Sequence, residues 1–143
     1  MSIMRKAIRR LTAACIAVLL PLLAGCSTLQ ETNCGPGEQS AVSDLLYFGT
    51  GKPIGVVSPE EWSSFLRGAV TPRFPSGFTA WKASGQWRSA GGQVIREESY
   101  VLNVVHPEDS KAEAAIEAMI SEYKARFRQE AVLRVKSRAC VSF

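Results

Sequence analysis

FTAWKASGQWRSAGGQVIREESYVLNVV, residues 78–105, contains two runs rich in aromatic and β-branched residues. Such residues favour strands, and Ser89-Ala90-Gly91-Gly92 between the runs favours a tight reversal of the chain. Residues 78–88 and 94–105 are therefore predicted to form a β-hairpin. Ser84-Gly85 predicts an irregularity within the first strand of that hairpin. An antiparallel sheet follows, and the segments on either side of the hairpin show how it is completed.

A helix is predicted on each side of the hairpin. Upstream, Ser58 can cap a helix that opens with a proline, and Glu61 completes a capping box. That helix ends by Thr71, because the residue before a proline avoids helical geometry. Downstream, Ser110 and Glu113 offer a second capping box. Apolar residues recur at helical spacing in both segments: Trp62, Phe65, Leu66 and Ala69 in the first, and Ala112, Ala115, Ile116, Met119, Ile120, Tyr123 and Phe127 in the second.

Two more strands are predicted outside the helices. Residues 44–49 form a short apolar run that closes with glycine, as buried strands do. Residues 131–143 alternate, with apolar side chains on one face and Arg134, Lys136 and Arg138 on the other. The order strand, helix, strand, strand, helix, strand predicts a ferredoxin-like α+β fold, βαββαβ. In that fold a four-stranded antiparallel sheet has the order 4-1-3-2, and both helices cover one of its faces.

This fold would bring Cys34 close to Cys140, because the first strand begins beside the end of the last one. In an oxidising compartment two such thiols most simply form a disulfide. The alternative is a pair of reduced cysteines, with Cys140 inside a buried strand. Neither a CxxC spacing nor a neighbouring histidine points to metal or redox chemistry at these residues.

The first residues have the form of an export signal. Four basic residues precede an apolar run, 11–23, that is shorter than the roughly 20 residues needed to cross a bilayer. The run leads into Leu23-Ala24-Gly25-Cys26, which resembles the lipobox of bacterial lipoproteins. Cys26 is then the site of lipidation, by a diacylglycerol and fatty acids such as palmitate. The alternative is an ordinary signal peptide cut nearby. Ser27 resembles the residue that follows the cysteine in signals passed to the outer membrane.

Export divides the chain into a lipoprotein signal peptide, residues 1–25, a flexible tether, residues 26–43, and one α+β domain, residues 44–143. The lipid anchor predicts that the outer membrane holds the protein, with the domain in the periplasm. The net charge of +4 comes from the four basic residues at the start, and without them thirteen basic residues face thirteen acidic ones. A neutral exported domain argues against nucleic-acid binding.

The sheet face without helices is the predicted place for a binding site. Glu97 and, on the last strand, Arg134 are expected there, where they would form a polar surface for an anionic or polar ligand. The alternative is a solvated face whose edge strand is protected by charge. A second group of arginines around the hairpin suits an anion or forms paired structural contacts. The candidate ligand-binding residues are Arg73, Gln86, Arg88, Arg96, Glu97, Gln129 and Arg134.

Catalytic and metal-binding patterns are absent from the sequence. The one histidine, His106, precedes Pro107 and is interpreted as a loop residue, because no acid or nucleophile accompanies it in a motif. A single histidine without a cysteine cluster argues against a zinc site. No nucleotide-binding or hydrolase motif occurs. We therefore expect neither a metal nor a cofactor.

A set of longer stretches follows the lipobox-like segment: LLYFG, VSPEEWSSFLRGAVTPRFPSGFT, GQWR, IREESYVL and YKARFRQEAVLRV. Together they resemble the bacterial family called domain of unknown function 3574, whose members are small and mostly exported or lipidated. VTPRFPSGFT and RFRQEAVLRV are the most specific parts, and Ala80-Trp81-Lys82 departs from a more aliphatic run. The resemblance implies a single domain and assigns no activity and no catalytic residue.

These observations favour a non-enzymatic lipoprotein that binds an envelope protein or a small polar ligand. Such binding predicts an exposed apolar patch or a groove around Trp81 and Trp87. One alternative is a small enzyme that uses a cavity on the open sheet face. The residues that could act in that cavity are Arg73, Arg96, Glu97 and Gln129. Another is a purely structural envelope component. Association into a homodimer through the open face is also predicted.

Overall fold

The structure, a computed structural model, describes residues 34–143. The predicted signal peptide, the predicted lipidation site Cys26 and the first part of the tether lie outside these residues. The elements run in the predicted order: β1 (Gln39–Gly49), α2 (Pro59–Phe65) with the π-helical turn η2 (Leu66–Val70), β2 (Thr79–Arg88), β3 (Val94–His106), α3 (Ser110–Phe127) and β4 (Leu133–Val141). Between residues 34 and 143, no helix is both long and apolar enough to cross a membrane.

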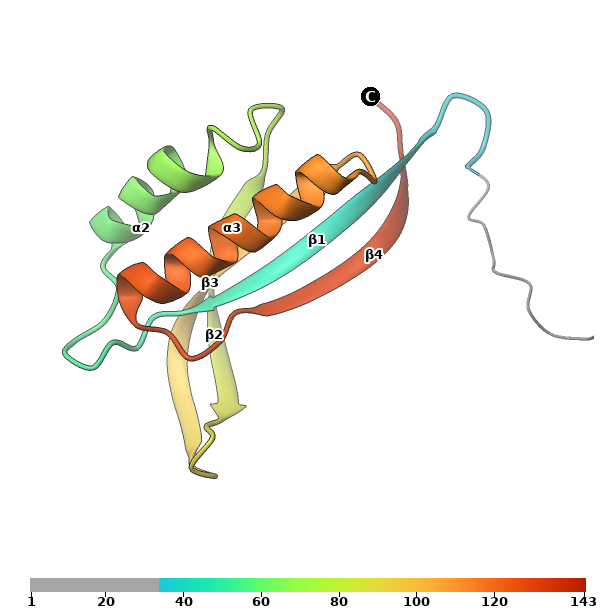
Figure 1. Cartoon of the computed structure of the whole chain (residues 1–143). Coiled ribbons are helices and arrows are strands. Elements are labelled where there is room, and N and C mark those ends of the chain that lie inside the picture. The colour runs from blue at the N-terminus through green and yellow to red at the C-terminus, as the bar shows by residue number, and fades with distance from the viewer. Residues whose placement is uncertain (1–33) are drawn as a thin grey trace, which may run out of the picture. The chain divides into compact units, whose positions relative to one another are not determined.

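The four strands form one antiparallel sheet in the order β2-β3-β1-β4, which confirms the predicted ferredoxin-like fold. Both helices lie on the same face of this sheet (Figure 1). The hairpin is regular along its whole length, because Ser84 pairs with Glu98 and Gly85 with Glu97. The predicted irregularity at Ser84-Gly85 is therefore wrong. The ladder of backbone hydrogen bonds continues past Gly85, where a methyl group would make only ordinary contact with Ser99.

β1 begins at Gln39, five residues before the predicted start of the domain at residue 44. Its first residues are polar, but they pair with the end of β4, Ser40 opposite Cys140. Beside this pair, a disulfide joins Cys34 to Cys140 with 5.4 Å between their Cα atoms. Cross-strand hydrogen bonds and this bridge order a segment whose composition resembles a linker. The last part of the predicted tether therefore belongs to the sheet.

The core lies between the helices and the sheet, and aromatic side chains fill its centre. Phe48 of β1 contacts Trp62 and Phe65 of α2 and Tyr123 of α3, with ring centroids 4.6–5.8 Å apart. Trp62 also stacks on Tyr100 of β3, with parallel rings 4.5 Å apart. Each such side chain contributes about 1.5–3 kcal/mol through burial. The predicted capping box is present at the start of α2, so the cap and this apolar stripe together place the helix.

The start of α3 differs from the prediction. Asp109, in extended geometry, caps this helix by accepting a hydrogen bond of 2.7 Å from the backbone N–H of Ala112. Ser110 is the first helical residue, and Glu113 does not complete a capping box. The predicted Ser110–Glu113 box is therefore wrong. An aspartate one residue earlier caps at least as well as a serine, and the Glu113 carboxylate is hydrogen-bonded to β4 instead.

Candidate functional site

The sheet face opposite the helices, called the open face below, is largely apolar. Side chains alternate along strands, so the residues next to core residues such as Phe48 and Leu102 project to this side. The open face carries Trp81 and Trp87 from β2, which are 44% and 38% exposed, and Leu133 and Val135 from β4, which are more exposed still. Both tryptophans are therefore partly exposed on this face, and neither is buried in the core.

A cavity of about 220 Å³ opens on this face at the end where β1 finishes. Its wall includes the rings of Tyr47 and Trp87 and the side chain of Leu133. Glu97 of β3 and Gln129, just after α3, add polar groups. Four separate parts of the chain therefore meet here, and the sheet order is what brings them together.

Glu97 is held in this cavity by neutral donors. Its Oε2 accepts hydrogen bonds from the backbone N–H groups of Thr50, at 3.1 Å, and Gly51, at 2.6 Å. Its Oε1 accepts a bond of 2.8 Å from the indole Nε1 of Trp87. The carboxylate thus connects the hairpin to the loop that follows β1. The Trp87 ring and the Glu97 carboxylate are therefore fixed relative to each other.

Two glycines leave room for this arrangement. A methyl group on Gly49 would lie 2.7 Å from Glu97 Oε1 and 3.1 Å from Gln129 Oε1, and one on Gly51 would lie 2.9 Å from Glu97 Oε2. The Gln129 amide nitrogen donates to the carbonyl oxygen of Gly51. From the helix side, the Tyr123 hydroxyl donates to the carbonyl oxygen of Gly49 at 2.8 Å. Two oxygens, one from a carboxylate and one from an amide, therefore converge above the Cα atom of Gly49.

The negative charge of Glu97 also affects the buried hydroxyl group of Tyr123. Burial raises the pKa of the Tyr123 hydroxyl, and the negative charge of Glu97 raises it further. Tyr123 therefore stays a neutral donor to Gly49 across the physiological pH range. That bond keeps the end of β1 in place beneath the cavity.

The predicted site residues divide into two sets. Gln86, Glu97 and Gln129 line the cavity. The arginines do not: Arg73 pairs with Glu122 at 3.0 Å, and Arg88 and Arg96 bond within the hairpin, to the carbonyl oxygen of Gly92 and to the Gln86 side chain. These arginines have the structural contacts that were the alternative to an anion site.

Arg134 lies on the other face of the sheet, so its predicted position on the open face is wrong. It stands opposite Leu46, a core residue, and its guanidinium binds Asp44 through two bonds of 2.7 Å and 2.6 Å. Lys136 and Arg138 share this side and pair with Glu113 and Glu108. Apolar and charged residues alternate along β4 as predicted, but each set lies on the face of the sheet that was predicted for the other. On this edge strand the apolar residues face outward and the charged ones reach the rim of the helix layer.

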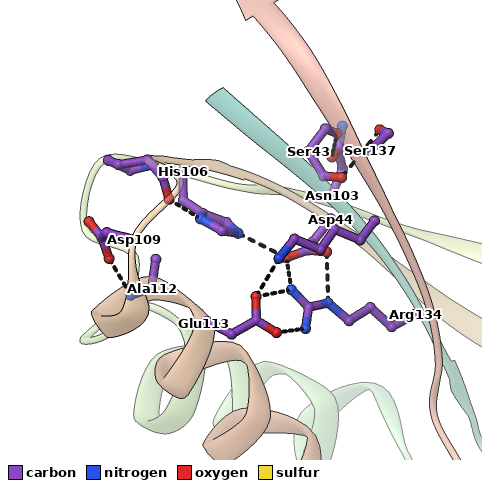
Figure 2. A network of polar contacts seen from close by, with 11 residues as sticks. Ser43, Asp44, Asn103, His106, Asp109, Ala112, Glu113, Arg134 and Ser137 are labelled. Atoms are coloured by element: carbon purple, nitrogen blue, oxygen red, sulfur yellow. Dashed lines mark hydrogen bonds and ion pairs between the residues drawn. The ribbon is translucent and has the colours of Figure 1, made fainter. Parts of the chain in front are cut away.

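Asp44 is the centre of a buried network that the sequence analysis missed (Figure 2). Its side chain is fully buried and accepts hydrogen bonds from Arg134 and, at 2.8 Å, from His106 Nε2. Arg134 continues the network to Glu113 on α3. His106 is the last residue of β3 and is buried, so its interpretation as a loop residue is wrong. A charged residue at the start of an apolar strand was the only signal in the sequence for this network.

The two carboxylates of the network, Asp44 and Glu113, are stabilised in their charged form by basic side chains. Burial alone would raise the pKa of Asp44, but the hydrogen bonds and charges of Arg134 and His106 outweigh it and hold the pKa below its ordinary value. Hydrogen bonds from Arg134 and Lys136 lower the pKa of Glu113 from its ordinary value to about 2. Every buried polar side-chain atom in residues 34–143 has a hydrogen-bond partner. This network therefore ties β1, β3, α3 and β4 together.

The solved structures that resemble this fold include a phage SAM lyase and a CutA protein. A phage SAM lyase in complex with S-methyl-5'-thioadenosine superposes with a TM-score of 0.52 at 14% identity, over 79% of this chain and 95% of that one. CutA from Synechococcus elongatus PCC7942 superposes with a TM-score of 0.50 at 10% identity, over 73% of this chain and 83% of that one. At these identities the likeness concerns the fold alone. No curated protein matches the sequence.

The sequence match to a family covers most of the chain. Residues 43–143 match the family described as Protein of unknown function (DUF3574). The matched region includes β1 from its middle, both helices, the hairpin and β4. It therefore contains the whole cavity and the whole Asp44 network. The chain belongs to the DUF3574 family, as its sequence predicted.

Proposed function

We propose that this protein is a lipid-anchored component of the bacterial outer membrane whose periplasmic domain binds a small ligand without catalysis. The observation that carries the binding function is the cavity on the open face, where the Trp87 ring and the Glu97 carboxylate are fixed side by side. A partly apolar cavity with a few oriented polar groups is typical of a ligand site. The anchor rests on the lipobox-like segment that ends at Cys26.

Binding is favoured over catalysis by the surroundings of Glu97. Its hydrogen bonds come from two backbone N–H groups and one indole, which fix its position. Of the residues described in the structure, those lining the cavity include no arginine, lysine, histidine or cysteine. A general acid or base usually works with a second group that stabilises developing charge. Glu97 therefore serves to orient and recognise a ligand.

The Cys26→Ala variant of the full chain is expected to leave the membrane fraction. Without the thiol no diacylglycerol can be attached, so the proposed lipid anchor is lost. Fractionation of cells followed by detection of the protein gives the measurement. The matched control is Cys15→Ala, which lies within the predicted signal peptide and should not alter attachment. Unchanged membrane association of Cys26→Ala would contradict the anchor.

Small fragments are expected to bind the purified domain beside Trp87. In a screen that includes neutral, anionic and cationic fragments, bound compounds should shift the indole N–H resonance of Trp87 more than that of Trp81. Trp87→Leu lacks this reporter, so binding is followed there through the backbone N–H resonances of the other residues in the cavity wall. Fragments should no longer shift those resonances, because the variant removes one wall of the cavity. Trp81→Leu is the matched control, since Trp81 lies on the same strand and face outside the cavity. Fragment binding that survives in Trp87→Leu would contradict this site.

A further inference from the structure

Three side-chain donors in the cavity wall already have partners within the protein. The Trp87 indole N–H donates to Glu97, the Gln129 amide donates to carbonyl oxygens of Gly51 and Phe127, and the Ser99 hydroxyl donates to the carbonyl oxygen of Ala83. These side-chain donors are used within the protein. The Tyr47 hydroxyl and the Gln86 amide are further donors in the lining, so the choice of ligand depends on where the acceptor oxygens and the charge lie.

Two acceptor oxygens of the cavity wall lie close to the same backbone position, Gly49. Glu97 Oε1 accepts only the Trp87 indole in the described contacts, and a carboxylate oxygen can accept about two hydrogen bonds. Gln129 Oε1 lies beside it above Gly49. A single group with several N–H donors could reach both oxygens at once. A hydroxyl group, with one donor, could reach only one of them.

The electrostatics of the cavity favour a positive charge. Glu97 takes part in none of the salt bridges found between residues 34 and 143, and its hydrogen-bond donors are neutral. Glu130 also lies in the lining, which holds no basic residue. The negative charge of the cavity is therefore not balanced by the protein around it. A cationic ligand would supply that balance, and an anionic one would be repelled.

The aromatic walls add to this preference and set the shape of the ligand. The rings of Tyr47 and Trp87 line the cavity together with Leu133. Aromatic faces attract organic cations, and the same faces bury an apolar body. A volume of about 220 Å³ suits a compact molecule. Carboxylate, amide oxygen and aromatic rings together describe a receptor for an amine with an apolar group.

We propose that the cavity binds a protonated primary amine that carries a small apolar body. The ammonium group donates to Glu97 Oε1 and Gln129 Oε1, and the apolar body rests against Trp87 and Tyr47. This proposal rests on the proposed function and names the ligand class of the same cavity. It predicts selectivity by charge as well as binding.

The test compares 2-phenylethylammonium with 2-phenylethanol, which has nearly the same shape and lacks the charge. Each is titrated into the purified domain at pH 7, and the Trp87 indole N–H resonance and tryptophan fluorescence report binding. The ammonium ion should bind about tenfold more tightly than the alcohol, because a hydrogen bond to a charged group is stronger than a neutral one. Higher salt should weaken binding of the ammonium ion and leave the alcohol unaffected.

Two variants assign the selectivity to Glu97. Glu97→Gln should abolish the preference for the ammonium ion, so that the ratio of the two affinities falls to about 1, because the charge of the carboxylate is gone. Glu98→Gln is the matched control, since Glu98 is the next residue, faces the other side of the sheet and pairs with Lys82. It should retain the full preference. Because Glu97→Gln can disturb the loop after β1, the comparison of the two ligands on the unmodified domain decides the question independently.

The outcomes separate this inference from the proposed function. Equal binding of the ammonium ion and the alcohol at Trp87 would overturn the ligand class and leave the binding site in place. Preference for an anion such as 3-phenylpropanoate would do the same. If the ammonium ion fails to shift Trp87 while other fragments do, the inference is also overturned. If no fragment of any charge shifts Trp87, both the inference and the proposed function fail.

Discussion

Replacing Asp44 with asparagine is expected to lower the free energy of unfolding by about 3–5 kcal/mol, the typical cost of removing one partner from a buried ion pair. The fully buried Asp44 carboxylate accepts two hydrogen bonds from Arg134 and one from His106. An asparagine amide has one acceptor oxygen and brings N–H groups toward these donors. The Arg134 charge then loses its buried partner and keeps only the half-exposed Glu113 carboxylate. Urea denaturation at pH 7 measures the change.

Asp109→Asn is the matched control, because it makes the same chemical change at the exposed cap of α3. Asparagine caps helices about as well as aspartate, so this variant should unfold close to the unmodified protein. A loss of less than about 1 kcal/mol in Asp44→Asn would contradict the central role of the network, since surface substitutions rarely exceed about 0.5 kcal/mol.

The same network predicts how stability depends on pH. The pKa values of Asp44 and Glu113 are lower in the folded state than their ordinary values, that of Glu113 falling from 4.5 to about 2. The unfolded chain therefore binds protons first as the pH falls, and the stabilisation present above about pH 4.5 is lost progressively toward pH 2. Denaturation midpoints measured across this range should decline, and less steeply for Asp44→Asn.

Loss of the disulfide is expected to lower the free energy of unfolding by about 5 kcal/mol, from the chain entropy that a bridge of this span removes from the unfolded state. Cys34 and Cys140 are separated by 106 residues, which is nearly the whole described chain. The bridge joins the start of β1 to the end of β4. The measurement is urea denaturation of the Cys34→Ser, Cys140→Ser double variant.

Reduction provides an independent control for this prediction. Dithiothreitol should destabilise the unmodified domain by a similar amount and leave the double variant unchanged. Equal stability of the oxidised and reduced domain would show that the strand ladder holds these ends without the bridge. That result would contradict the predicted contribution.

The parts of the fold that depend on local sequence were predictable. Ser58 and Glu61 cap α2 as their spacing predicts, and the apolar periodicity of both helices gives their buried sides. The hairpin follows from two β-rich runs and a glycine-rich turn. Once these elements are in order, the sheet topology follows, and with it the proximity of Cys34 to Cys140. Local patterns and a single topological rule were sufficient here.

The face of each residue on β4 was not predictable in this way. Alternation separates Arg134 from Leu133 but does not say which of them meets the helices. An apolar side chain normally faces the core, yet the edge position of β4 leaves its inner side at the rim of the helix layer. There Asp44 and Glu113 offer Arg134 better partners than the open face does. These partners lie far away in the sequence, so only the folded chain identifies them.

In the candidate site too, some features were predictable from the sequence and others depend on contacts made only in the folded chain. Glu97 and Gln129 were among the predicted candidate residues, and they do line the cavity. The three donors to Glu97 come from Trp87 and from the backbone of the loop after β1. Backbone N–H groups carry no residue-specific signal, so the sequence cannot indicate that they bind a carboxylate. The wall formed by Leu133 was missed because β4 was assigned the opposite orientation.

The disulfide has a mechanical consequence. A pull on the chain ahead of Cys34 enters the domain at a covalent bond to Cys140, so β1 and β4 share the load at once. β1 is also hydrogen-bonded to β3 along its length. Force along the strands would therefore have to shear two ladders together, instead of opening one bond after another. The β2–β3 hairpin that holds Trp87 and Glu97 lies on the other side of β1 from β4, away from the bridged edge. The disulfide thus spreads tension over both β1 and β4 at the end of the domain nearest the predicted anchor.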